Sequence, residues 1–131
     1  MENNICLDTD FLVAFLRNDP EAVQWIKQNE EKCTLATTTI NLFELHHGAA
    51  KSNKKEQNKE KVNQLGQRLI QLTLSAKSAE KAGELLAHLE KTGQPIHIKD
   101  ILIGSITLAE GFAVKTNNKK HFERIDGLNV L

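Results

Sequence analysis

The amino-acid sequence predicts an α/β fold in which a central, mainly parallel sheet carries helices on both faces. Two observations support this fold class. Short runs rich in apolar and β-branched residues alternate along the chain with segments of helical periodicity. Strands separated by helical segments also imply parallel crossovers, which cover both faces of a sheet.

The chain begins with a strand and two helices. Residues 4–9 form a short β-like run, and residues 10–18 have the apolar spacing of a helix. A second helix is predicted over 20–31, because Asp19 suits the N-cap position and Pro20 the first helical position.

The middle of the chain repeats the alternation. A strand is predicted over 32–39 and a helix over 40–52, for which Thr38 or Thr39 is available as the N-cap. The lysine-rich segment 53–69 then leads into the next strand. The remaining predicted elements are strands over 70–74, 112–116 and 128–131, and helices over 78–93 and 99–111 that end at Gly93 and Gly111.

Composition limits the classes of protein to consider. The 131 residues are about the length of one domain, so we expect a single domain over 1–131. The 17 basic and 17 acidic residues balance, which predicts no general attraction to nucleic acids or membranes. No apolar run approaches the roughly 20 residues of a membrane span, and Cys6 and Cys33 lack metal-site spacing. We therefore expect a soluble cytoplasmic protein with reduced thiols.

Four polar residues from distant parts of the chain are predicted to meet at one edge of the sheet. Asp8 ends the first strand, Glu44 lies in the helix after the second, Asp100 opens a later helix, and Asn118 follows the strand 112–116. Ligand sites of such sheets lie beyond the carboxyl ends of the strands. Two carboxylates about 4 Å apart repel by roughly 4 kcal/mol at a dielectric near 20, so this cluster predicts a bound cation. Oxygen ligands favour Mg²⁺ or Mn²⁺.

A family likeness appears in four stretches, taken in order. They are LDTDFLVAFL at 7–16, TTTINLFELHHGAAKS at 37–52, IHIKDILIGSITLAEG at 96–111 and VKTNNKKHFERIDGL at 114–128. Together they resemble the PIN-domain ribonucleases, and among these the VapC-type toxins of prokaryotic toxin–antitoxin pairs. The resemblance covers nearly the whole chain and implies a PIN-like three-layer α/β/α sandwich.

The resemblance also implies a reaction and its residues. Asp8, Glu44 and Asp100 would hold Mg²⁺ or Mn²⁺, and a metal-bound water would hydrolyse an RNA phosphodiester bond. Asn118 stands where many family members carry a fourth acid, so a second metal ion is less certain. Asp10 departs from the neutral residue expected there; we expect it to cap the following helix, and the alternative is that it restores the missing charge.

Neighbouring residues are candidates for contact with the substrate. Thr9 and Thr116 carry hydroxyls beside the predicted acids, and Lys119 and Lys120 lie close to Asn118 in sequence. Cations next to a metal centre suit RNA phosphates. Aromatic residues make up only 5% of the chain, which argues against stacking platforms and favours recognition of a structured RNA such as tRNA.

The resemblance implies two protein partners. One is a cognate VapB-like antitoxin that binds an apolar groove of the early helices, to which Phe11, Val13, Phe15, Leu16, Trp25 and Phe43 are candidates to contribute. The other is a second copy of the chain in a homodimer. Two alternative functions stay open: a non-catalytic PIN-like module that binds protein or RNA, and a DNA-directed nuclease that uses the same carboxylates.

Overall fold

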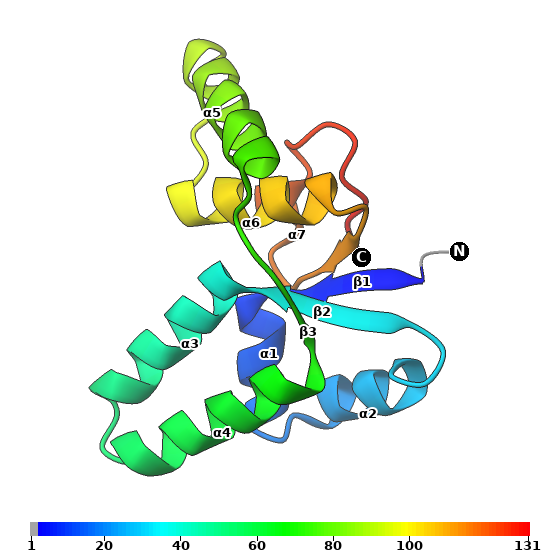
Figure 1. The fold of residues 1–131 in the computed structure, drawn as a ribbon, viewed down its shortest axis with the longest axis vertical. Helices are drawn as coiled ribbons and strands as arrows, with labels where there is room; N and C mark the ends of the chain where they lie inside the picture. The colour runs from blue at the N-terminus through cyan, green and yellow to red at the C-terminus, as the bar shows by residue number, and fades with distance from the viewer. Residues whose placement is uncertain (1–2) are drawn as a thin grey trace.

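The computed structural model describes residues 3–131 and consists of a four-stranded parallel sheet between two layers of helices (Figure 1). The strand order is β3-β2-β1-β4, so the first strand lies inside the sheet next to the last. The strands are β1 (Asn4–Leu7), β2 (Thr34–Thr38), β3 (Ile70–Leu72) and β4 (Ala113–Lys115). The helices are α1 (Thr9–Leu16), α2 (Pro20–Asn29), α3 (Thr39–Lys51), α4 (Lys55–Arg68), α5 (Ala76–Lys91), α6 (Ile98–Ala109) and α7 (Lys119–Phe122). The predicted α/β fold with a parallel central sheet is confirmed.

Helix starts follow the capping chemistry of the sequence. Asp19 accepts a hydrogen bond from the backbone of Ala22, with Pro20 next to it in α2. Of the two candidate caps for α3, Thr38 takes the position and forms a reciprocal capping box with Asn41. Helix ends follow glycine conformation in the same way, because the left-handed φ of Gly93 and Gly111, at 68° and 76°, suits a helix stop.

The structure differs from the prediction at two places after β4. The predicted strand 128–131 is reduced to one bridging residue, Val130, which pairs with Val114 of β4. Helix α7 was not predicted, because four residues are too few to show a helical period. This short helix follows β4 directly and so lies at the carboxyl edge of the sheet.

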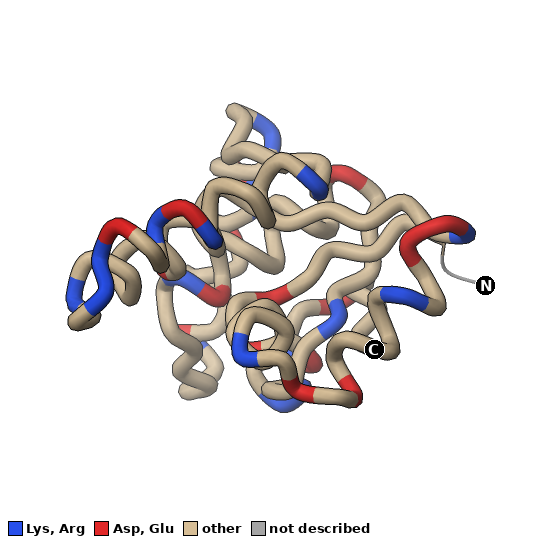
Figure 2. Tube along the Cα trace, turned by 90° about the horizontal axis from the view of Figure 1, so that it is seen from below, with Lys and Arg blue, Asp and Glu red and all other residues tan. Residues whose placement is uncertain are grey.

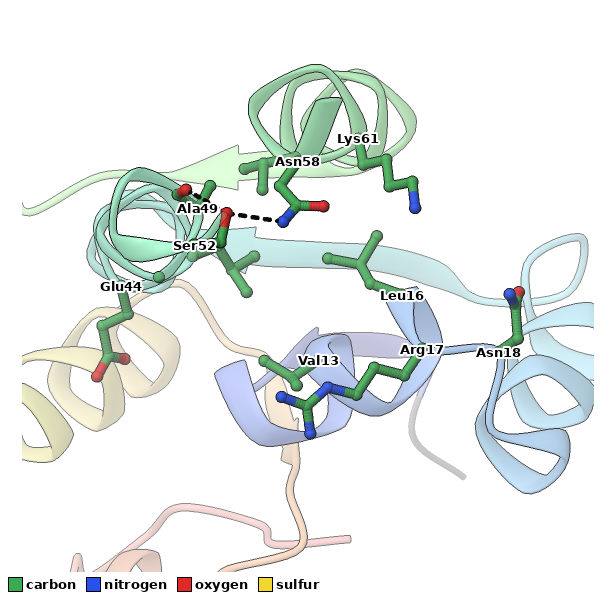
Figure 3. Close-up of a pocket in the computed structure, with 12 residues that line it drawn as sticks. Val13, Leu16, Arg17, Asn18, Glu44, Ala49, Ser52, Asn58 and Lys61 are labelled. Carbon is green, nitrogen blue, oxygen red and sulfur yellow. Dashed lines mark hydrogen bonds between the residues drawn. The ribbon is translucent and has the colours of Figure 1, made fainter. Parts of the chain in front are cut away.

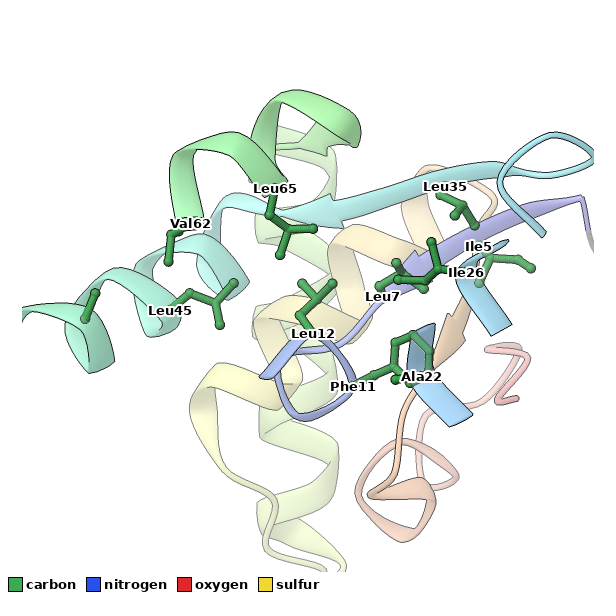
Figure 4. Packing of buried hydrophobic residues seen from close by; sticks show 11 residues of the cluster. Ile5, Leu7, Phe11, Leu12, Ala22, Ile26, Leu35, Leu45, Val62 and Leu65 are labelled. Carbon is green, nitrogen blue, oxygen red and sulfur yellow. The ribbon is translucent and has the colours of Figure 1, made fainter. Parts of the chain in front are cut away.

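Each face of the sheet has its own core. Beneath it, β1 and β2 pack on α1 to α4 through buried residues such as Leu7, Leu12 and Leu45 (Figure 4). On the opposite face α6 and α7 pack on β4 through Ile103 and Phe122, among others. Cys6 is fully buried in a smaller cluster with Ala36, Leu72 and Ile106, and burial raises the pKa of its thiol to about 12.

Charged residues of both signs are spread over the elements, in keeping with the zero net charge (Figure 2). No helix within 3–131 is long and apolar enough to cross a membrane.

Gly104 supports a prediction about stability. A Cβ atom at this position of α6 would overlap the Ile125 side chain and touch Phe122 and Leu128 at 3.6 Å. We expect Gly104→Val to destabilise the fold by about 1–3 kcal/mol, as overpacking of a filled core does. Chemical denaturation measures this, with Gly83→Val as the control because its Cβ would meet nothing within 4 Å. Equal losses in both variants would contradict the packing argument.

Candidate functional site

Asp8 is the centre of a polar cluster at the carboxyl edge of the sheet. It follows β1 directly, occupies the N-cap position of α1, and is only 5% exposed. Its Oδ1 accepts a hydrogen bond from Asn41 Nδ2 at 3.1 Å, and its Oδ2 accepts one from Thr116 Oγ1 at 2.8 Å. Because Asn41 belongs to α3 and Thr116 follows β4, three distant segments meet at this one carboxylate.

The ionisation of Asp8 reflects its burial. Desolvation raises the pKa of Asp8 to about 6, although hydrogen bonds from the Thr116 hydroxyl and the Thr9 backbone act to lower it. The negative charges of Asp10 and Asp100 raise this pKa further. Asp10 and Asp100 are therefore close enough to Asp8 to repel its carboxylate electrostatically.

Glu44 joins this cluster through neutral side chains. Thr9 Oγ1 donates to Glu44 Oε1 at 2.6 Å and accepts from Asn41 Nδ2 at 2.9 Å. The other oxygen of Glu44 lies 3.6 Å from the Lys99 ammonium of α6, an ion pair with both side chains partly exposed. Glu44 and Asp8 thus share one hydrogen-bonded network through Thr9 and Asn41.

Asn41 was not predicted to belong to the site. It is fully buried, and its amide oxygen binds the Thr38 backbone and hydroxyl while its amide nitrogen binds Asp8 and Thr9. All polar groups of its side chain are therefore occupied. The T-x-x-N spacing of a capping box was the available signal in the sequence.

Asp100 lies in the first turn of α6, next to the site and one-fifth exposed. Its Oδ2 is 2.9 Å from His121 Nδ1, which comes from the short helix α7. His121 was not among the predicted site residues, because a helix of four residues is too short to show a period that would predict its packing on α6. His97 caps α6 by accepting a hydrogen bond from the Lys99 backbone.

The expectation that Asp10 caps α1 is wrong. The helix starts at Thr9 with Asp8 in the N-cap position, so Asp10 falls in the first helical turn. Its carboxylate accepts the backbone N–H of Asn117 at 3.2 Å and faces the Thr116 hydroxyl at 3.5 Å. Asp10 therefore ties the loop after β4 to the start of α1.

Asn118 reaches this network through its backbone. Its N–H donates to Thr116 Oγ1 at 2.9 Å, while its exposed side chain makes no hydrogen bond to the acids in the described part of the chain. Thr116 thus accepts from Asn118 and donates to Asp8 at the same time.

In this conformation the acids do not converge into a complete metal site. Within 3–131, no three Asp, Glu, His or Cys side chains converge closely enough to hold an ion. All three carboxylates have neighbours within the protein: Asp8 is bonded by Asn41 and Thr116, Asp100 by His121, and Glu44 by Thr9 and Lys99. The chemistry of the donor set fits a hard divalent cation, which would also relieve the repulsion around Asp8.

A basic pocket of about 550 Å³ lies beside the acids. Residues 115–121 line it, including Lys115, Lys119, Lys120 and His121. The Lys115 ammonium is 5.6 Å from the centre of the Phe11 ring and 5.5 Å from that of Trp25. Burial in this place lowers the pKa of Lys115, and the positive charge of Lys119 lowers it further.

A second groove, of about 560 Å³, runs between α1, α3 and α4. Its wall contains the predicted Val13 and Leu16, with Glu44 near one end and Asn18 near the other (Figure 3). The remaining lining residues are Arg17, Leu45, Gly48, Ala49, Ser52, Asn58, Lys61 and Val62. Four of the predicted groove residues, Phe11, Phe15, Trp25 and Phe43, lie elsewhere: the first three pack in or against the lower core, and Phe43 is exposed.

Comparison with known proteins identifies the family to which this fold belongs. The model of the PIN domain family matches residues 5–128. The chain belongs to the PIN domain family. Nucleases of this family generally act with a divalent metal ion.

Individual relatives agree over almost their whole length. Ribonuclease VapC2 of Rickettsia felis is 37% identical, covering 93% of this chain and 92% of the relative. The tRNA(fMet)-specific endonuclease VapC of Shigella flexneri is 30% identical, covering 95% of this chain and 93% of the relative. The crystal structure of Rickettsia felis VapBC2 bound to a promoter DNA fragment superimposes with a TM-score of 0.90 at 34% identity, over 97% of this chain and 96% of the other. The predicted resemblance to VapC-type PIN ribonucleases is confirmed.

Proposed function

We propose that this PIN-family ribonuclease is an antitoxin-controlled toxin that hydrolyses phosphodiester bonds of structured RNA such as tRNA, with Asp8, Glu44 and Asp100 as its acidic residues. The observation that carries the assignment is Asp8, which is buried, repelled by Asp10 and Asp100, and held in place by donors from α3 and from the loop after β4. Buried charge without a cationic partner is costly, so such a group marks a functional site.

Asp8, Asp100 and Glu44 would hold Mg²⁺ or Mn²⁺, and when bound the ion lowers the pKa of a water and offsets charge on the phosphate. Neighbouring residues of the chain hold these carboxylates in position. Asn41 and Thr116 fix both oxygens of Asp8, His121 orients Asp100, and Thr9 orients Glu44. Asn118 contributes an uncharged amide in place of a fourth acid.

The basic pocket supplies contacts to the substrate in this proposal. Lys119 and Lys120 line it beside Thr116, and their ammonium groups suit the phosphates that flank the cleaved bond. Such contacts recognise the RNA backbone and not the base sequence. A tRNA-sized substrate is supported by the name of the Shigella flexneri relative, a tRNA(fMet)-specific endonuclease.

Cleavage of total cellular RNA tests the proposal. The purified chain should produce discrete fragments with Mg²⁺ or Mn²⁺ and none with EDTA, and a panel of tRNA, unstructured RNA and DNA should identify the substrate class. Preferential cleavage of DNA would favour the DNA-directed alternative. Binding of RNA without any cleavage would favour the non-catalytic module.

The groove between α1, α3 and α4 is the proposed site for a VapB-like antitoxin. Its aliphatic wall suits the apolar face of a peptide segment, and Glu44 near one end offers a carboxylate to a basic side chain. The VapBC2 complex from Rickettsia felis supports an antitoxin partner. We also propose a homodimer, which light scattering of the purified chain tests.

Gly48 allows the groove to be blocked without disturbing the fold. It lines the groove, and a Cβ atom there would meet nothing within 4 Å. We expect Gly48→Trp to weaken antitoxin binding at least about tenfold while RNA cleavage continues, because the indole would occupy the groove. Calorimetric titration with the cognate antitoxin measures the loss. Gly83→Trp on α5 is the matched control, and equal affinities of the two variants would place the antitoxin elsewhere.

A further inference from the structure

An aromatic pair stands exposed on the outer side of α3. Phe43 is 59% exposed, the highest value among the exposed large apolar side chains of the described chain. Its ring lies 6.3 Å from the His47 ring at an interplanar angle of 13°, so the two are stacked. Because the residues are four apart on one helix, the stack holds the Phe43 ring in a defined orientation.

The pair lies on the helix that carries Glu44 and points away from the core. The buried side of α3 carries Asn41, Leu45 and Ala49, and the aromatic pair points in the opposite direction. Glu44 follows Phe43 directly, and its carboxylate contacts Thr9 and Lys99 at the site. The stacked rings and one acid of the site therefore occupy the same turn of the helix.

The shape of this surface indicates the chemistry of what binds it. The lining of the neighbouring aliphatic groove includes Leu45, Gly48 and Ala49 of α3 but neither Phe43 nor His47. The stacked pair instead presents an open, flat ring, which suits another flat π system more than a branched peptide side chain. Unpaired nucleobases bind proteins in this way, on aromatic side chains beside a backbone-binding surface.

We propose that Phe43, held by His47, is a stacking platform for one unpaired nucleobase of the RNA substrate, close to the phosphate that the acids cleave. The inference rests on the proposed ribonuclease function and adds a structural requirement to it. Cleavage then needs an unpaired nucleotide next to the cut, whatever its base, because every base offers a π face. The low aromatic content of the sequence had argued against such a platform; exposure of one ring beside the site supplies it.

Affinity for RNA tests the platform in an Asp8→Asn background, in which the RNA stays intact. The RNA is an oligonucleotide that contains the mapped cleavage site. It is compared with oligonucleotides that lack one base at a single position around that site, and fluorescence anisotropy measures binding. We expect Phe43→Leu to weaken binding about tenfold, Phe43→Trp to restore it, and Leu74→Ala, a similarly exposed apolar residue on another segment, to leave it unchanged. One abasic version should bind weakly and be insensitive to Phe43→Leu.

Two results would overturn the platform while leaving the ribonuclease function intact, provided that the wild-type chain cleaves RNA. In the first, the proteins with and without Phe43→Leu bind the RNA with equal affinity. In the second, Phe43→Leu lowers the oligomeric mass and leaves the RNA affinity unchanged. The second would make Phe43 a contact between two copies of the chain. Absence of any RNA cleavage by the wild-type chain would overturn the ribonuclease function and the platform together.

Discussion

Asp8→Asn is expected to reduce RNA cleavage about 10³-fold or more. The asparagine keeps the shape of the side chain and an oxygen for the Asn41 amide, but it removes the charge that would hold a divalent ion. Loss of several kcal/mol of metal-dependent stabilisation corresponds to a loss of that size. Initial rates on the mapped RNA with saturating Mn²⁺ measure it, and Asp100→Asn should behave in the same way.

Asp126→Asn is the matched control, because this exposed acid lies outside the network described above. It should cleave at the wild-type rate. Retention of activity in Asp8→Asn or Asp100→Asn would contradict the assignment of these acids and move the reaction to another part of the chain.

The second large effect concerns stability without metal. The pKa of Asp8 is about 6 in the folded chain against an ordinary value of 3.8. The folded state therefore binds more protons than the unfolded state between these pH values, and the free energy of unfolding falls as pH rises through this window. The loss is complete above pH 6 and amounts to about 3 kcal/mol, because each pKa unit corresponds to about 1.4 kcal/mol.

Asp8→Asn should remove this pH dependence and be more stable than the wild-type chain at pH 7.5 in EDTA. Urea denaturation of both proteins at pH 4 and pH 7.5 measures the difference, and subtraction cancels the titration of the other acids. A wild-type chain that is not weakened relative to Asp8→Asn at the higher pH would contradict the burial argument. Higher stability together with lost cleavage would also show that the variant is inactive for chemical reasons.

The sequence predicted much of the site because strand ends are visible in it. Asp8 follows an apolar run, and parallel strands bring the residues after them to one edge of the sheet. Asp8, Glu44 and Asp100 could therefore be predicted to lie together without knowledge of the order of the strands in the sheet. Asp10 was misjudged because a helix boundary is uncertain by a residue or two, and here Asp8 took the N-cap position.

The residues that were missed act across the fold. Asn41 resembles an ordinary capping residue in the sequence, and only the packing of α3 on β1 shows that its second amide group reaches Asp8. His121 depends on a four-residue helix whose direction is set by burial of Phe122. The exposure of Phe43 was equally hidden, because an aromatic residue in a helix is more often part of the core.

The contact between Thr116 and Asp8 spans 108 positions of the chain. The cluster around Asp8 therefore stays incomplete until β4 and the loop after it have been synthesised, because that loop supplies the Thr116 hydroxyl. A ribosome carrying a partial chain would hold Asp8 without its neighbour strand, its Thr116 hydroxyl or His121.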